Sequence, residues 1–205
     1  MLDGLMRRAL DPSLNTVGRA LAGRGVKANH VTLIGLLLGL LSAGLIAAGA
    51  STLLALVPLV ASRMADGLDG AVARSSSITD FGGFLDIVCD FIFYGAIPLA
   101  FVLRDPTNNG VAGAFLLMAF YANGASFLAF AILAAKRGMK TESRGLKSLY
   151  FTAGLLEGTE TIAFFVVISI VPTAFAPLSM VFGAMCFFTA ISRIVLAWQV
   201  FGKPD

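Results

Sequence analysis

The sequence has few charged residues. Asp, Glu, Lys and Arg together make up 13% of its 205 residues, whereas hydrophobic residues make up 58%. Soluble domains carry about 25% charged residues, so this composition excludes an ordinary soluble domain and indicates a membrane protein. Cysteine is also scarce, because Cys89 and Cys186 are the only two and no metal-ligand spacing surrounds either. We expect both to be packing residues, not a disulfide or a metal pair.

Long apolar runs fill most of the chain. Six of them are close to the length of about 20 residues that a membrane-spanning helix needs. They cover residues 31–50, 52–74, 81–103, 111–135, 149–172 and 177–200. We therefore predict an all-α integral membrane protein in which residues 29–205 form one domain of six transmembrane helices. No internal repeat or low-complexity segment interrupts it.

Residues 1–28 are predicted to form an N-terminal cytoplasmic juxtamembrane segment. This segment mixes acids, bases and apolar residues, so we expect no secretory signal. Apolar residues recur at helical spacing, which predicts a short amphipathic helix at the inner membrane interface, ended by Asp11-Pro12. The residues that carry this spacing are Leu2, Leu5, Met6, Ala9 and Leu10.

The positive charges are unevenly distributed among the connections. Five bases precede the first run, five more lie between the fourth and fifth runs, and Lys203 follows the sixth. The opposite connections carry almost none, with Arg104 as the exception. Positive residues mark the cytoplasmic face, so we expect a multi-pass inner membrane protein with both termini in the cytoplasm. This rule already explains the basic connection, so we expect no nucleic acid partner.

Four aspartates interrupt the apolar sequence at helical spacing. Asp66, Asp69, Gly70, Ala73 and Arg74 stand at i, i+3, i+4, i+7 and i+8, and therefore share one helical face. Gly82, Asp86 and Asp90 step by four and share a face of the next helix. At 1.5 Å per residue, Asp66 and Asp90 lie about 12 and 13 Å from the cytoplasmic ends of their helices. The two faces are therefore predicted to meet around a polar cavity open to the cytoplasm.

Acids inside a membrane indicate a functional site, because a carboxylate in hydrocarbon is costly. Arg63, Arg74 and Arg193 cannot neutralise these four aspartates together with Glu157 and Glu160, so bound metal explains the excess acid better. Hard divalent cations prefer carboxylate oxygens and often bridge substrate phosphates. Two such ions can stabilise both oxygens of a displacement at phosphorus. The small side chains of Gly67, Gly70 and Ala73 allow another helix or a flat nucleotide to approach this face.

Several charged and polar residues have two open interpretations each. Glu157 and Glu160 either recognise an acceptor or pair with Arg63 or Arg193, and Arg193 either binds an anionic acceptor or neutralises these glutamates. We expect Arg63, one turn deeper than Asp66, to neutralise an acid of the fifth run. Asn123 is expected to connect helices.

The pattern Asp66-x2-Asp69-Gly70-x2-Ala73-Arg74, followed by Gly82-x3-Asp86-x3-Asp90, resembles the signature of the CDP-alcohol phosphotransferases. These six-helix membrane enzymes make phospholipids. All eight fixed positions are filled, with a spacer of seven residues before Gly82 where eight is commoner. Asn29-x2-Thr32 also resembles the opening of the first helix in that family.

The resemblance implies roles for individual residues. Asp66, Asp69 and Asp86 would ligate two Mg²⁺ or Mn²⁺ ions, and Asp90 would touch the second ion and act as the general base. Arg74 and Gly70 would contact the CDP group. Thr79 would bind a phosphate, and Asn29 and Thr32 would close the nucleotide pocket.

The implied reaction moves a phosphatidyl group from a CDP-alcohol, by preference CDP-diacylglycerol, to a small polar alcohol with release of CMP. A membrane homodimer is the usual assembly in such a family. Glycerol phosphate, inositol phosphate, inositol and serine remain open as acceptors, as does the reverse arrangement with diacylglycerol as acceptor. An intramembrane, magnesium-dependent prenyltransferase and a cation transporter are the alternative functions.

Overall fold

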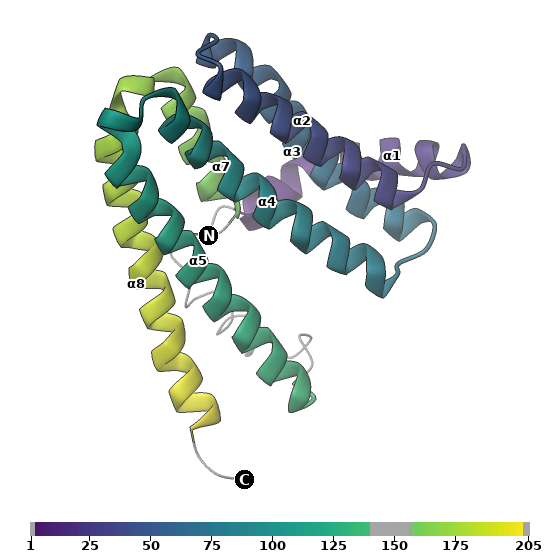
Figure 1. The fold of residues 1–205 in the computed structure, drawn as a ribbon. Coiled ribbons are helices and arrows are strands. Elements are labelled where there is room, and N and C mark those ends of the chain that lie inside the picture. The colour runs from purple at the N-terminus through teal and green to yellow at the C-terminus, as the bar shows by residue number, and fades with distance from the viewer. Residues whose placement is uncertain (1–2, 140–155, 157, 203–205) are drawn as a thin grey trace.

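Every regular element of the computed structural model is a helix, and the structure describes residues 3–139, 156 and 158–202 (Figure 1). Its helices, in chain order, are α1 (Asp3–Gly23), α2 (Ala28–Ala47), α3 (Thr52–Ser75), α4 (Asp80–Arg104), α5 (Pro106–Lys136), α7 (Gly158–Ile170), the short 3-10 helix η1 (Pro172–Ala174) and α8 (Phe175–Phe201). The basic residues Lys140, Arg144, Lys147 and Lys203, and the first part of the predicted fifth span, lie outside the described residues.

Helices α2, α3 and α4 form the part of the bundle that carries the acidic motif, with α2 packed against both of the others. Hydroxyl groups fasten α2 to α3 in antiparallel register. Ser42 donates to the carbonyl of Ala55, and Ser62 donates to the carbonyl of Gly35, both at 2.7 Å. The absent side chain of Gly39 makes room for Phe93 of α4, since a Cβ there would lie 2.5 Å from the ring. Close approach therefore fixes how α3 and α4 face each other.

Helices α5 and α8 lie side by side and extend away from this group, and α4 connects the two parts by its contact with α5 (Figure 1). Aromatic rings fill the junction. Phe101 of α4 stacks on Phe175 of α8 with 4.8 Å between ring centroids, and both rings are fully buried. Phe165 of α7 packs edge-on against Phe93. Phenylalanine rings thus hold this junction together.

Four of the described helices are long and apolar enough to cross a membrane, namely α2, α4, α5 and α8 with the preceding η1. Their outward side chains are apolar, as at Val111 and Met118. Helix α3 has 24 residues but carries charges such as Arg63 and Asp66, and α7 has 13 described residues. The prediction of an all-helical membrane protein is confirmed, whereas the count of six spans stays a prediction.

Helix α1 differs from the prediction, because it does not end at Asp11-Pro12. It runs on through Pro12 to Gly23 and packs against α3. A proline inside a helix removes one amide donor and disfavours the helical conformation of the preceding residue. Packing compensates for that loss here, since a Cβ at Gly18 would lie only 2.7 Å from the Cβ of Ala71.

Candidate active site

Three carboxylates from α3 and α4 converge on one point. Asp66, Asp86 and Asp90 each offer an oxygen, and these three oxygens lie within 4.8 Å of one another. All three residues are half-buried. The helical spacing predicted that the two acidic faces would meet, and the structure places these three side chains together. Like charges so close together repel one another, so the group calls for a compensating cation.

Asp69 lies beside this group with a different partner. Its side chain is buried, and its Oδ2 accepts a 2.6 Å hydrogen bond from the hydroxyl of Thr32 on α2. Thr32 was predicted to close the nucleotide pocket, and the structure gives it this further contact. The bond fixes one oxygen of Asp69 and connects the start of α2 to the acidic face of α3.

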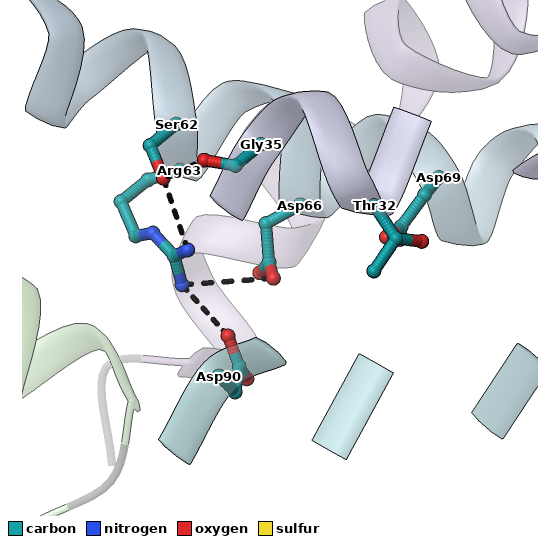
Figure 2. A network of polar contacts seen from close by, with 7 residues as sticks. All are labelled: Thr32, Gly35, Ser62, Arg63, Asp66, Asp69 and Asp90. Atoms are coloured by element: carbon teal, nitrogen blue, oxygen red, sulfur yellow. Dashed lines mark hydrogen bonds and ion pairs between the residues drawn. The ribbon is translucent and has the colours of Figure 1, made fainter. Parts of the chain in front are cut away.

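Arg63 is the cation that the structure places at the carboxylate group. Its Nη1 donates to Asp90 Oδ1 at 2.8 Å and lies 3.6 Å from Asp66 Oδ1 (Figure 2). The structure thus pairs Arg63 with aspartates of α3 and α4, and its pairing with an acid of the fifth span stays a prediction. The side chain of Arg63 reaches from α3 to α4, where Asp90 is the acid at matching depth. Its Cζ also lies 3.8 Å from the ring centroid of Phe93.

A cavity of about 210 Å³ adjoins the carboxylates at the end of the bundle where α2 and α4 begin and α3 ends. The five residues predicted to contact the nucleotide all line it, together with two of the acids. Its lining includes Asn29, Thr32, Gly70, Arg74 and Thr79, as well as Asp69 and Asp86. The residues predicted for the nucleotide therefore lie together around one cavity, and the roles assigned to them stay predictions.

Two glycines keep this cavity open. A Cβ at Gly82 would lie 3.0 Å from Thr79 Oγ1 and 3.3 Å from Asn29 Oδ1, and a Cβ at Gly70 would lie 3.2 Å from Arg74 Nη1. Thr79 caps α4, because its hydroxyl oxygen accepts a hydrogen bond from the amide of Gly82 at 3.0 Å. Any larger side chain at these positions would press on groups that face the cavity.

Helix α1 supplies a residue that sequence analysis missed. Asn15 Oδ1 accepts a 3.0 Å hydrogen bond from Arg74 Nη2, so α1 holds the arginine that lines the cavity. Gly67 permits this approach, since a Cβ there would lie 3.0 Å from Leu14. The prediction that Gly67 allows a helix to come close is thus confirmed. The spacing of Leu14 and Gly18 on one face of α1 is a signal from which such packing could have been inferred.

The buried Arg193 lies on α8 and contacts α5. It donates to the carbonyl and side-chain oxygens of Asn123, both at 2.9 Å, and to Ser126 Oγ at 2.6 Å. Asn123 therefore connects two helices, as predicted. Glu157 lies outside the described residues. Both cysteines are free and buried, in agreement with a packing role.

The donor set fits a hard divalent metal. The converging ligands are carboxylate oxygens, which are the donors that Mg²⁺ and Mn²⁺ prefer. No cysteine or histidine belongs to this group. A cation would offset the repulsion between these oxygens of two helices, and the cavity lies next to them.

The fold and the site define a multi-pass helical membrane protein with an acidic centre beside a polar cavity. The chain belongs to the CDP-alcohol phosphatidyltransferase family, whose model matches residues 26–201. It is 43% identical over 194 residues to the inner membrane protein YnjF of Escherichia coli (strain K12), covering 95% of this chain and 94% of YnjF. Archaetidylinositol phosphate synthase of Pyrococcus horikoshii is 31% identical over 123 residues, covering 57% of this chain and 64% of that protein. The protein is therefore a transferase of phospholipid biosynthesis.

Proposed function

We propose that the protein transfers a phosphatidyl group from CDP-diacylglycerol to a small polar alcohol and releases CMP. The observation that carries this proposal is the convergence of Asp66, Asp86 and Asp90 within 4.8 Å beside a polar cavity. A diphosphate donor needs positive charge around its phosphates and room for its base and sugar. The acidic group can hold metal ions that supply the positive charge, and the cavity provides room for the base and the sugar.

In this proposal Asp66, Asp69, Asp86 and Asp90 hold two Mg²⁺ or Mn²⁺ ions. When bound, these ions would offset the negative charge that develops on the phosphates and on CMP as it leaves. Asp90 lies on α4, one turn beyond Asp86, and its Oδ1 already accepts from Arg63. It is the proposed general base for the acceptor.

The proposed reaction is a displacement at the phosphorus bonded to the lipid. The acceptor oxygen forms a bond to this phosphorus, the bond to the bridging oxygen breaks, and CMP leaves with that oxygen. The proton of the acceptor hydroxyl goes to Asp90. Positioning by the cavity converts the encounter of donor and acceptor into a reaction within one complex.

The cavity residues are assigned to the cytidine nucleotide. Arg74 supplies a guanidinium for the phosphates, which suits its planar set of donors. Gly70 leaves room beside it, Thr79 offers a hydroxyl at the start of α4, and Asn29 and Thr32 border the cavity from α2. The contact of Asn15 with Arg74 holds this guanidinium next to the cavity.

The same proposal includes six membrane crossings, with α3 and α7 as the two that composition alone does not identify. Helix α3 is long enough to cross at 24 residues, and its acids face α4 and the site. Helix α1 is assigned to the cytoplasmic interface, where it would cover the site end of α3. A homodimer completes the proposed assembly.

The test is release of CMP by purified protein reconstituted in lipid, with CDP-diacylglycerol, Mg²⁺ or Mn²⁺, and one alcohol at a time. The panel contains glycerol phosphate, inositol, inositol phosphate and serine. Inositol phosphate belongs in it because the Pyrococcus relative is named for making archaetidylinositol phosphate. We expect one alcohol to stimulate release and EDTA to abolish it. Release that persists in EDTA would contradict the metal-dependent reaction.

Variants at aspartates of one helix provide the matched control. Asp86 belongs to the converging group, whereas Asp80 lies exposed in the first turn of the same helix. We expect D86N to lose CMP release and D80N to retain it. Absence of release with every alcohol would direct the assay to CDP-choline and CDP-ethanolamine with diacylglycerol. Failure to bind CMP at all would contradict the nucleotide site and favour a transporter.

A further inference from the structure

We propose that Arg63 is an internal counter-cation, which holds Asp66 and Asp90 together in the metal-free protein and leaves them when a divalent ion binds. This inference rests on the proposed function, because it takes the carboxylate group as the metal site. It concerns a residue outside the eight-position acidic motif. It also assigns Arg63 a role in metal binding beyond that of a structural ion pair.

The guanidinium of Arg63 lies against two of the three carboxylates. Arg63 Nη1 lies 2.8 Å from Asp90 Oδ1 and 3.6 Å from Asp66 Oδ1, so one nitrogen bridges an acid of α3 and an acid of α4 (Figure 2). These two carboxylates belong to the three whose oxygens lie within 4.8 Å. A divalent cation shared by Asp66 and Asp90 would need the same place between them. Two cations cannot share that place, because like charges a few ångströms apart repel each other.

The side chain of Arg63 is enclosed and has contacts other than the acids. Its side chain is only 9% exposed, and the face of Phe93 lies 3.8 Å from its Cζ. Nη2 donates to Ser62 Oγ at 3.1 Å, whereas the buried Nε has no hydrogen-bond partner among the residues that the structure describes. Ser62 and Phe93 can therefore retain the guanidinium when it withdraws from the acids. Its hydrogen bonding is incomplete in this position, which lowers the cost of leaving it.

The three carboxylates carry more negative charge than Arg63 can offset. Asp66, Asp86 and Asp90 would bring three negative charges to one point, and Arg63 is the cation that contacts two of them. One positive charge reduces the repulsion between the acids of α3 and α4 but leaves net negative charge. A divalent ion offers twice the charge at the same place. Exchange of Arg63 for metal is therefore favourable, and Arg63 sets its affinity.

The test measures Mn²⁺ binding to purified, metal-free protein, by the loss of the electron paramagnetic resonance signal of free Mn²⁺. We expect R63Q, which removes the competing charge but keeps the chain length, to bind Mn²⁺ about tenfold more tightly than the original protein. The R63K variant keeps a charge without the planar donor set, and we expect its affinity to lie between the two. R24Q is the matched control, since it removes an exposed positive charge at the same end of the molecule.

The Mn²⁺ affinities of these variants decide whether Arg63 competes with the metal. Tighter binding in R63Q with an unchanged R24Q supports the proposal, as does an R63Q protein that folds only with Mn²⁺ present. Equal or weaker binding in R63Q overturns the role of Arg63 but leaves the metal site standing. If R63Q does not fold under either condition, R63K decides by the same comparison. Absence of Mn²⁺ binding in all proteins would instead refute the metal site, and the inference with it.

Discussion

The four aspartates of the site share a residue type but differ in their partners. Asp90 accepts from Arg63, whereas Asp69 accepts from the neutral hydroxyl of Thr32. Asp86 joins the converging group from the next helix and also lines the cavity. A charged partner compensates the carboxylate, and a neutral one only orients it. Side chains of one type therefore have different partners within one site.

The role of Asp90 as general base leads to a first prediction. In D90N the amide cannot accept the proton of the acceptor, so we expect CMP release to fall by about 100-fold or more. CMP binding should persist, because Asp90 does not line the cavity assigned to the nucleotide. The measurement is the rate of CMP release together with the dissociation constant for CMP. Turnover at the original rate in D90N would exclude the assignment, and D80N serves as the control for loss of an acid from α4.

The hydrogen bond from Thr32 to Asp69 leads to a second prediction. T32V replaces the hydroxyl with a methyl group of similar size and leaves a buried carboxylate oxygen without its donor. Hydrogen bonds to charged groups contribute about 1.5–3 kcal/mol, so we expect the free energy of unfolding to fall by about this amount in metal-free protein. Thermal unfolding in detergent with and without Mn²⁺ measures it.

T189V is the matched control for this change. Thr189 is also buried on a helix, but its hydroxyl donates only to the carbonyl of Met185 within its own helix, at 3.0 Å. We expect T189V to lower stability less than T32V. Equal effects would show that the contact with Asp69 adds nothing to stability.

At the level of helices, α1 brings the N-terminal segment of the chain into contact with the site. It packs on α3, and Asn15 receives the hydrogen bond from Arg74. Gly18 makes this possible, because α1 passes so near α3 that a Cβ would lie 2.8 Å from the backbone of Ala71. Backbone atoms cannot move aside as the end of a flexible side chain can. The packing of α1 therefore depends on Gly18 as well as on Gly67 of α3.

This packing leads to a third prediction. G18A should separate α1 from α3 and lower the free energy of unfolding by about 1–3 kcal/mol, as overpacking of a close contact does. The affinity for CMP should also fall, since Arg74 would lose its contact with Asn15. G23A is the control on the same helix, because a Cβ at Gly23 meets nothing within 4 Å. Equal stability of G18A and G23A would contradict the close contact described here.

The helices differ in how far their arrangement could be predicted. Spacing by three and four placed Asp66 on one face and Asp86 and Asp90 on another, and those faces do meet. Periodicity identifies a face of a helix but does not name what covers it. The choice of Asp66 and Asp90 as partners of Arg63 and the contact of Asn15 with Arg74 therefore do not follow from the spacing.

Local rules failed in α1 for a related reason. Pro12 disfavours a helix by its missing amide and its effect on Asp11, and this predicted an end that the structure does not have. Tertiary packing against α3 outweighs that local cost. The outcome depends on residues about sixty positions away in the sequence, such as Ala71, which local signals cannot include.

Considered as a whole, the molecule has two unlike ends. The start of α2, the end of α3 and the start of α4 surround the cavity at one end, where Arg74 lies. At the other end, Arg104 donates to the carbonyl of Ala50 at 2.6 Å, beyond the last turn of α2. Its charge is thus held by backbone carbonyls near the turn between α2 and α3. Which of these ends faces the cytoplasm stays a prediction of the rule for positive residues.

The orientation leads to a final prediction. Helix α2 has 20 residues, hence a length of about 30 Å, which matches the hydrocarbon thickness of a bilayer. Gly23 and Ser51 are both exposed and lie beyond its opposite ends. In G23C and S51C, a membrane-impermeant maleimide should reach only S51C in right-side-out vesicles and only G23C in inverted ones. Because the native Cys89 and Cys186 are buried, the unmodified chain should label little and serves as the background. Labelling of both positions from one side would mean that α2 does not cross the membrane, and a reversal of the two would place the site on the outer face.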